Sequence, residues 1–283
     1  MISNINNPEI TIIGAGGKMG MRLLNNLSKK NYNLFTCEIS KNGIERIKEK
    51  GFEISNMEKI VPLSDFIILA IPDVKIFEIS KKIIPIMKEK STVIILDPAA
   101  AFAKKIFLRD DCTFVVTHPC HPELFYFQKT KEARSDMFGG VAAEQNIIIA
   151  LLQGDESNFK RAEKICRDMF SPVLNAFRIT VEQMVLLEPA AVEVLSASCL
   201  SVIRESLDEL VRRGVPKETA EAFMFGHLNI ELAILFKSTN PFSDAALKAI
   251  KYGRKKIFKK NWKNIFKEES INEVLEIMLN PNS

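Results

Sequence analysis

The class of fold is decided by the stretch Ile10-Thr11-Ile12-Ile13-Gly14-Ala15-Gly16-Gly17-Lys18-Met19-Gly20. Its first residues are β-branched, which is typical of a strand, and its glycines let the chain turn tightly into a helix. Backbone N–H groups at such a turn, with the positive end of the helix behind them, bind a pyrophosphate. The spacing reads as GxGxxxG from Gly14 or as AxGxxG from Ala15, and an ordinary strand–helix turn is the alternative interpretation. The candidate dinucleotide-binding residues here are Gly14, Ala15, Gly16, Gly17, Lys18, Met19 and Gly20.

Three later positions support dinucleotide binding. Glu38 ends the second predicted strand, about 20 residues after the glycines, where a carboxylate accepts hydrogen bonds from the adenosine ribose. The same charge repels a 2′-phosphate, so the sequence favours NAD over NADP, although a solvated strand-end carboxylate is the alternative interpretation. The apolar run 66–71 is followed by Pro72, and the small Ala70 with this proline leaves room for a dinucleotide. We therefore add Glu38, Ala70 and Pro72 to the cofactor-binding candidates.

The first half of the chain alternates between strand-like and helical segments. Strand-like runs lie near 9–13, 33–37, 65–71, 92–96 and 113–117, and helical segments lie near 17–30, 41–50 and 74–88. This alternation predicts an α/β fold, with a Rossmann doubly wound parallel sheet forming an NAD-binding domain over residues 1–154. The run near 146–152 either joins this sheet or leads out of it.

The second half predicts an all-α C-terminal domain over residues 155–283, apart from a possible extended stretch at 172–179. Thr180 and Gln183 form a capping box at the start of a long helix that stops at Gly214. Pro189 lies inside this helix, so we expect a kink there. A second helix is expected from Lys217 to about residue 237. Both helices are so apolar that we expect this domain to form a homodimer as well as to complete the substrate site.

Composition excludes several classes of protein. The 283 residues are 47% hydrophobic and 26% charged, which is a globular balance. Unbroken apolar runs have only the length of strands, so we expect no membrane span, and we see no signal peptide.

Five scattered cysteines favour a reducing, cytoplasmic location. A net charge of +4 is too mild to indicate a nucleic-acid partner. The lysine-rich stretch 248–267, with interleaved aromatics, favours an amphipathic helix with a solvated basic face over a nucleic-acid surface.

Two of the three histidines lie in Thr117-His118-Pro119-Cys120-His121-Pro122-Glu123, directly after the run 113–117. The carboxyl ends of parallel strands are where ligands bind in open α/β sheets. Oxidation of a hydroxyl group needs a proton acceptor there. We therefore take His118 and His121 as catalytic candidates, against the alternative of a rigid surface turn with solvated histidines. We interpret Cys120 as a packing residue.

The predicted helices carry two more catalytic candidates. Glu188 lies in the apolar stretch 186–191, where a buried carboxylate needs a cation or hydrogen-bond donors. A solvent-facing position is the alternative. His227 lies on the second helix, where a lone histidine is more often a satisfied core residue.

The ordered motifs of the chain resemble those of the D-apionate oxidoisomerase family, to about residue 253. They are GAGGKMG at 14–20, DPAAAF at 97–102, HPCHPELF at 118–125, LLEPAA at 186–191, GVP at 214–216, GH at 226–227 and FSDAALKAI at 242–250. The resemblance implies NAD-linked oxidation of a branched sugar acid, coupled to isomerisation into a 3-oxo acid. It also implies a divalent metal near the pocket, held by His118 and Glu188. One imidazole and one carboxylate suit zinc or manganese better than magnesium.

Two other functions stay open at this point. A metal-free Rossmann dehydrogenase of the prephenate or β-hydroxy-acid type is one, but the simple β-hydroxy-acid enzymes often use a lysine on the long helix, and residues 181–213 contain none. An NAD-sensing binding protein is the other, but a sensor needs no histidines at the nicotinamide end.

Overall fold

We describe the protein from a computed structural model, over residues 7–237 and 240–280. The chain divides into two compact units. The first comprises Met1–Leu186 with Asn272–Ser283, and the second comprises Leu187–Ile271.

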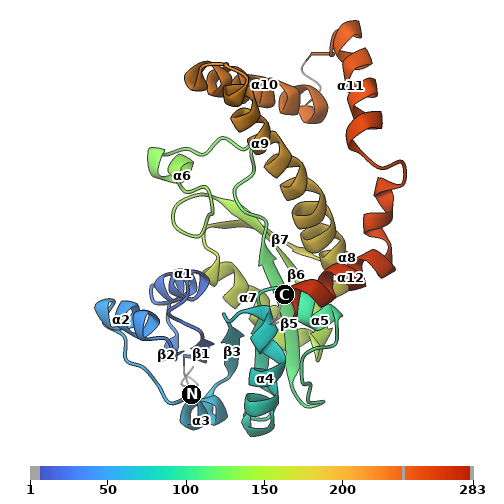
Figure 1. Ribbon diagram of the computed structural model, residues 1–283. Coiled ribbons are helices and arrows are strands. Elements are labelled where there is room, and N and C mark those ends of the chain that lie inside the picture. Colours follow the sequence, from blue (N-terminus) through green and yellow to red (C-terminus); the bar gives the residue numbers. More distant parts are fainter. Residues whose placement is uncertain (1–6, 238–239, 281–283) are drawn as a thin grey trace. The chain divides into compact units, whose positions relative to one another are not determined.

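The first unit is built on a seven-stranded sheet (Figure 1). Its strands are β1 Glu9–Ile13, β2 Asn33–Cys37, β3 Phe66–Leu69, β4 Thr92–Ile95, β5 Thr113–Pro119, β6 Gln145–Gln153 and β7 Val173–Arg178. Their order in the sheet is β2-β1-β3-β4-β5-β6-β7, and every neighbouring pair is parallel except β5 with β6. This confirms the doubly wound Rossmann sheet. The open question about the run near 146–152 is also resolved, because that run joins the sheet as the antiparallel β6.

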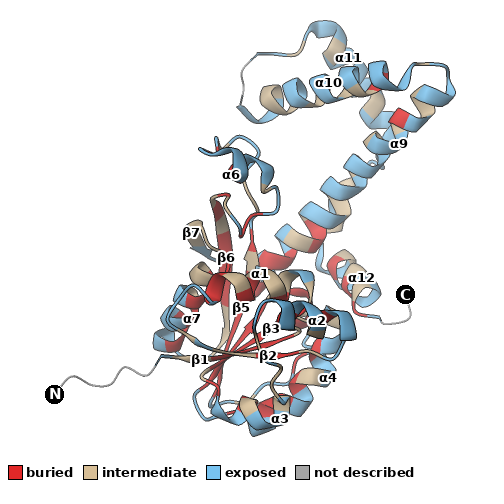
Figure 2. Cartoon of the chain, turned by 90° about the vertical axis from the view of Figure 1, so that its left-hand side faces the viewer, coloured by how far each residue is buried: buried red, intermediate tan, exposed pale blue. Residues whose placement is uncertain are grey.

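Helices cover both faces of the sheet. One face packs against α1 (Lys18–Leu27) and α7 (Glu156–Met169), which lie in the same apolar core. On the other side α4, α5 and α8 form a packed series, with α8 against β6. The helical segments of this unit are α1, α2 (Lys41–Glu49), α3 (Met57–Ile60), η1 (Val61–Leu63), α4 (Asp73–Ile83), η2 (Ile84–Ile86), α5 (Ala99–Phe102), α6 (Lys131–Ser135), α7 and α8 (Val181–Val185). Figure 2 shows the central strands as the buried centre of the unit.

The first unit extends beyond the boundary expected at residue 154. Helix α7 packs against β4, β5, β6 and β7, and β7 pairs with β6 in the same sheet. The possible extended stretch at 172–179 is therefore the last strand of the Rossmann unit. The chain also returns to this unit at its C-terminal end, where Leu275 and Leu279 are buried. Short apolar segments of this kind carry no signal of which unit will bury them.

The long helix begins as expected and differs in its middle. Thr180 and Gln183 form the predicted capping box at the start of α8. A π-helical segment, η3 (Leu186–Ala197), follows, and α9 (Ser198–Arg212) ends just before Gly214. A simple kink was expected at Pro189. Proline has no N–H and its ring crowds the carbonyl one turn earlier, and a widened helix turn relieves that crowding.

The second unit contains helical elements with much exposed apolar surface. They are η3, α9, α10 (Lys217–Lys237), α11 (Asp244–Ile257) and η4 (Trp262–Phe266), and α12 (Glu268–Met278) leads back to the first unit. Figure 2 shows α9, α10 and α11 mostly exposed. On α10, Phe223 is 67% exposed and Phe236 is 69% exposed. Apolar side chains so open to solvent are typical of a surface that another protein covers.

One helix within the described residues, Val181–Arg212, is long and apolar enough by length and composition to cross a membrane. The expectation of no membrane span rested on unbroken apolar runs alone. This helix was not counted because Glu188 and Glu193 interrupt its apolar residues. Length and composition do not separate a membrane helix from a helix that packs against another protein surface.

Candidate active site

The glycine loop joins β1 to α1 and lies against the ends of two other strands. The N–H groups of Gly14 and Ala15 donate to the carbonyl of Cys37, at 2.9 and 3.2 Å, which ties the loop to the end of β2. Gly14 has a φ of +80°, and a Cβ there would collide with the carbonyl of Ala70 and lie 2.8 Å from Cγ2 of Ile71. Only glycine therefore fits where the loop meets the end of β3.

The loop leaves the N-terminus of α1 without a side-chain cap. Gly17 is the N-cap residue, so it has no side chain that could accept from the first-turn N–H groups. Those groups belong to a helix end that favours an anion, and Lys18 and Met19 lie in that first turn. A Cβ at Gly20 would collide with the carbonyl of Gly14, so this glycine keeps the helix close to the loop. The geometry fits a pyrophosphate.

Glu38 follows β2 and is held by three backbone donors. Its Oε2 accepts from the N–H of Gly16 at 2.9 Å, and its Oε1 accepts from Ile39 and Ser40 at 2.8 and 2.9 Å. Burial by itself raises the pKa of this carboxyl, but the three backbone N–H groups outweigh it and the pKa lies below its ordinary value. Glu38 is therefore an ionised carboxylate fixed beside the glycine loop.

Two supporting residues of this site were missed in the sequence. A Cβ at Gly43 would lie 2.6 Å from Oγ of Ser40 and 2.7 Å from Cδ of Glu38, so this glycine leaves room for the carboxylate. Arg46 donates from Nε and Nη2 to the carbonyl of Gly16, at 2.9 and 2.6 Å. Their only sequence signal is a glycine in the first turn of α2 with an arginine three residues later, and that pattern is common.

The end of β3 forms the other side of this site. The N–H of Ala70 donates to the carbonyl of Ile13 at 2.9 Å, and the Ala70 carbonyl is the group nearest to Gly14. Pro72 is the N-cap residue of α4. Ala70 thus lies directly against the glycine loop, while Pro72 starts the next helix.

The two histidines of the first unit lie together at the end of β5. The strand runs through Pro119, two residues further than its apolar run, so His118 lies within it and opposite Ile148 of β6. The rings of His118 and His121 meet edge to face, with centroids 6.1 Å apart and planes at 81°. The sequence expectation of a histidine pair in one place agrees with this geometry.

Each of these imidazoles has a defined tautomer. Nδ1 of His118 is 2.9 Å from the carbonyl of Pro119, and Nδ1 of His121 is 2.8 Å from the carbonyl of Phe138. A carbonyl only accepts, so Nδ1 carries the hydrogen in both rings. Nε2 is then the nitrogen that carries the lone pair in the neutral form. His121 also has a φ of +59°, a conformation that non-glycine residues seldom adopt outside constrained sites.

Cys120 was expected to be a packing residue and is exposed instead. Strand β5 ends at Pro119, so Cys120 lies just beyond the strand. Burial raises the pKa of the Cys37 thiol to about 11 and that of the Cys166 thiol to about 12. These two thiols stay protonated near neutral pH and do not act as nucleophiles.

Glu188 and His227 belong to the second unit. Glu188 is partly buried in the π-helical segment η3. His227 is exposed on α10, with its ring stacked on Phe223 at 4.0 Å and its Nδ1 donating to the Phe223 carbonyl at 2.8 Å. The alternative interpretation, a histidine buried in the core of its own chain, does not apply to His227, and its catalytic role stays a proposal. The convergence of Glu188 with His118 stays a proposal.

Residues 7–237 and 240–280 contain no cluster of three or more histidine, cysteine or acidic side chains that could hold a metal ion. The expected ligands, His118 and Glu188, come from different units and supply only two donors. A metal there would need further oxygen ligands from substrate and water. The metal therefore stays a proposal.

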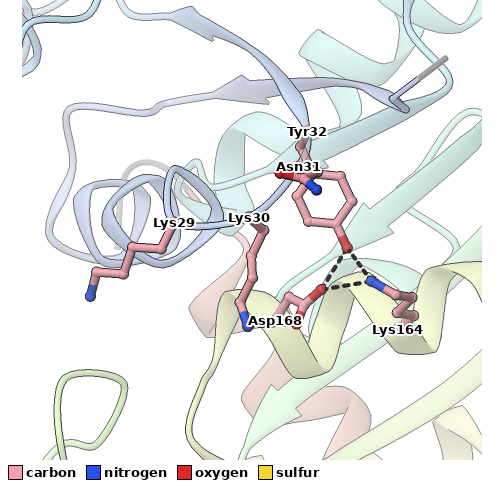
Figure 3. A pocket seen from close by; sticks show the side chains of 6 residues that line it. All are labelled: Lys29, Lys30, Asn31, Tyr32, Lys164 and Asp168. Carbon is pink, nitrogen blue, oxygen red and sulfur yellow. Dashed lines mark hydrogen bonds and ion pairs between the residues drawn. The ribbon is translucent and has the colours of Figure 1, made fainter.

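One pocket of the first unit lies away from the glycine loop. Its volume is about 310 Å³, and Figure 3 shows the residues that line it, which are Lys29, Lys30, Asn31, Tyr32, Lys164 and Asp168. The Tyr32 hydroxyl donates to Asp168 at 2.6 Å and accepts from Lys164 at 3.0 Å. Tyr32 directly precedes β2, so this pocket is at the amino edge of the sheet, opposite the cofactor loop. We assign these residues a structural role, because the hydrogen bonds of Tyr32 with Asp168 and Lys164 connect the α1–β2 turn to α7.

Comparison with known families agrees with this geometry. Residues 127–279 match the family described as phosphogluconate dehydrogenase (decarboxylating), C-terminal part. Residues 4–123 match the family described as acetohydroxy acid isomeroreductase, NADPH-binding domain.

Several relatives match nearly the whole chain. D-apionate oxidoisomerase from Blautia hydrogenotrophica is 42% identical over 278 residues, which cover 96% of this chain and 97% of that protein. D-apionate oxidoisomerase from Pectobacterium atrosepticum is 41% identical over 271 residues, with 95% of each chain covered. A semialdehyde dehydrogenase NAD-binding protein from Cupriavidus necator, solved in complex with calcium and NAD, has a TM-score of 0.93 at 42% identity. That match covers 96% of this chain and 99% of the other.

Proposed function

Because the chain belongs to the D-apionate oxidoisomerase family and is an NAD-dependent oxidoreductase, we propose that its substrate is D-apionate or a close relative among branched sugar acids. The observation that carries the proposal is the placement of a histidine pair at the end of β5, in the same sheet that holds the glycine loop and Glu38. Hydride transfer requires a proton acceptor on the side of the sheet where the cofactor binds.

The proposed roles follow from the geometry of each residue. The glycine loop from Gly14 to Gly20 binds the pyrophosphate, and Glu38 accepts hydrogen bonds from the adenosine ribose. NAD, when bound, supplies the acceptor for a hydride. Nε2 of His121 accepts the proton of the substrate hydroxyl while the hydride leaves the same carbon, so that a carbonyl forms.

The isomerisation step needs no further oxidant. The bond between the branched carbon and its hydroxymethyl group breaks, and its electron pair forms a new bond to the carbonyl carbon made in the oxidation. The hydroxyl on the branched carbon loses its proton and becomes the 3-oxo group, while the former carbonyl oxygen takes up a proton. We propose that His118, Glu188 and His227 all act in this step. His227 exchanges these protons, and His118 and Glu188 would hold the divalent ion that stabilises the negative charge on the two oxygens.

We further propose that a divalent ion, zinc or manganese, is held by His118 and Glu188. The support is the chemistry of the two donors, because imidazole and carboxylate together favour these ions over magnesium. Calcium prefers oxygen ligands, so an imidazole is a poor ligand for it. If the proposal is correct, alanine at either position removes bound zinc or manganese in elemental analysis while NADH affinity is unchanged.

We propose that the protein works as a cytoplasmic homodimer, with a small-molecule substrate and with neither nucleic acid nor membrane as a partner. The support for the dimer is the apolar surface of α10, with Phe223, Phe225 and Leu235 more than half exposed. The support for a reducing compartment is that Cys37, Cys112 and Cys166 are buried thiols outside any disulfide. The basic stretch 248–267 was expected to be one amphipathic helix. It instead comprises the end of α11, a break and η4, and it is mostly exposed.

A screen of sugar acids tests the proposed substrate. The purified protein is mixed with NAD⁺ and D-apionate, with unbranched sugar acids as controls, and NADH is followed by absorbance with and without chelator. We expect turnover with D-apionate and at least about a hundredfold loss in the variant His121→Ala, as for removal of a general base. Turnover only with unbranched acids contradicts the proposed substrate, and NADH binding without turnover on any acid favours an NAD-sensing protein.

A further inference from the structure

The turn at residues 136–143, which follows α6, contacts His121 directly. The Nδ1–H of His121 donates to the carbonyl of Phe138 at 2.8 Å, and the two rings lie edge to face with centroids 6.1 Å apart. The orientation of this imidazole is therefore set by where the turn places one backbone carbonyl. Phe138 itself is 64% exposed, so burial of its side chain alone does not fix that carbonyl.

Asp136 stabilises this turn through hydrogen bonds to other residues of the turn. Its Oδ2 accepts three backbone hydrogen bonds, of 3.0, 2.9 and 3.1 Å, from the N–H groups of residues 141–143. Its own carbonyl accepts from the N–H of Gly139 at 3.2 Å. Burial alone raises the pKa of this carboxyl, but the backbone donors and the charge of Arg22 bring it below its ordinary value. Asp136 is thus an anion that closes the turn around Phe138.

Two side chains of α1, the helix that follows the glycine loop, also contact this turn. Nδ2 of Asn26, a buried side chain, donates to the carbonyl of Gly140 at 2.8 Å. The guanidinium of Arg22 lies 5.0 Å from the centre of the Phe138 ring. Gly139 and Gly140 have φ values of +73° and +80°, and a Cβ at Gly139 would lie 2.6 Å from Oε1 of Gln145. The turn is therefore specified by its sequence and is anchored to the helix that begins at the cofactor loop.

We propose that Asp136 is a positioning residue, which acts through the Phe138 carbonyl to keep the hydrogen of His121 on Nδ1 and to present Nε2 as the proton acceptor. The identity of His121 as that acceptor rests on the proposed function. The effect of Asp136 on the tautomer does not, because it follows from the hydrogen bonds alone. A carbonyl that moves away leaves the imidazole free to exchange its hydrogen to Nε2, and the ring then has no acceptor where the substrate hydroxyl binds.

Nitrogen NMR of the ligand-free protein tests the tautomer directly. The chain has only three histidines, so protein labelled with ¹⁵N-histidine gives three imidazoles, which the variants His118→Ala and His227→Ala assign. We expect His121 in the wild type to have the Nδ1–H form. We expect Asp136→Ala to give a mixture of the two tautomers, and Asp136→Asn, whose amide oxygen still accepts, to restore the wild-type form.

Asp155→Ala is the matched control. Asp155 accepts from the N–H groups of Ser157 and Asn158, at 2.8 and 2.9 Å, in the same unit but at the start of α7. Its variant keeps the wild-type tautomer of His121. Gly139→Ala is a second variant for the case in which Asp136→Ala does not fold, and it gives the same mixture of tautomers.

Turnover separates this inference from the proposed function. With D-apionate, kcat falls roughly tenfold in Asp136→Ala, a part of the roughly 100- to 10,000-fold that a general base contributes, while the Kd of NADH is unchanged. A wild-type tautomer in both Asp136→Ala and Gly139→Ala overturns the inference, whatever the substrate. A changed tautomer in a protein whose wild type oxidises no sugar acid overturns the proposed function and leaves the inference standing.

Discussion

The carboxylate of Glu38 accepts a hydrogen bond of 2.9 Å from the backbone N–H of Gly16, across a separation of 22 residues in the chain. This contact joins the end of β2 to the glycine loop and puts a fixed negative charge beside it. Because the pKa of Glu38 lies below its ordinary value, the charge persists throughout the neutral range. The first two predictions follow from this contact.

The first prediction concerns the choice of cofactor. A fixed carboxylate at the ribose repels a 2′-phosphate, so NADH binds at least about tenfold tighter than NADPH, roughly 1.4 kcal/mol. Fluorescence titration measures both affinities. In Glu38→Gln the preference shrinks, while Glu45→Gln on the exposed side of α2 keeps it. Equal affinities of the wild type for the two cofactors contradict the assigned role of Glu38.

The second prediction concerns Gly43. The variant Gly43→Ala places a Cβ 2.7 Å from Cδ of Glu38, so the carboxylate must leave its backbone donors. NADH affinity falls roughly tenfold, and the preference over NADPH falls with it. Gly253→Ala is the control, because a Cβ there meets no atom within 4 Å and its backbone is helical. An affinity in Gly43→Ala equal to that of the control refutes this account of the loop.

The residues that form the cofactor site were predictable from the sequence, but the residues that hold them in place were not. The glycine loop, Glu38 and the strand ends were predictable because each depends on a few consecutive residues with special backbone or charge requirements. Arg46 and Asp136 were missed because they bind backbone groups, which carry no side-chain signal. Gly43 was missed because its need for space beside Glu38 depends on where that carboxylate lies in the folded chain. The expected boundary after residue 154 came too early for a similar reason, since only tertiary pairing shows that 173–178 extends the sheet.

The third prediction concerns assembly. The apolar side chains of α10 that are open to solvent need a protein surface to cover them. Light scattering at micromolar concentration gives the mass of a dimer. The charged double variant Phe223→Glu with Leu235→Glu lowers the mass to that of a monomer, whereas charge added at Phe77, an exposed apolar residue on α4, does not. A monomeric wild type contradicts the prediction.

The fourth prediction concerns stability near the Tyr32 pocket (Figure 3). The variant Tyr32→Phe loses a hydrogen bond of 2.6 Å to Asp168, so the free energy of unfolding in urea falls by about 1 kcal/mol at neutral pH. Tyr252→Phe is the control, since Tyr252 is 66% exposed.

The difference in unfolding free energy between the wild type and Tyr32→Phe depends on pH. Burial raises the pKa of Asp168, but Tyr32 and Lys164 outweigh it, so the folded pKa lies below the ordinary carboxyl value. A depressed folded pKa contributes stability above the unfolded pKa, and this stability is lost as pH falls through the folded value. The difference between wild type and Tyr32→Phe therefore shrinks below about pH 4. A difference that grows on acidification contradicts the role of the Asp168 carboxylate.

The proposed function requires one protein both to oxidise a branched acid and to rearrange its carbon skeleton. Carbon-13 NMR of the product from labelled D-apionate and NAD⁺ detects both steps, with NADH measured in the same sample. We expect one NADH for each molecule of a 3-oxo acid in which the hydroxymethyl carbon is bonded to the carbon next to the carboxylate. A 2-oxo acid with the original carbon connections, formed with the same yield of NADH, would contradict it.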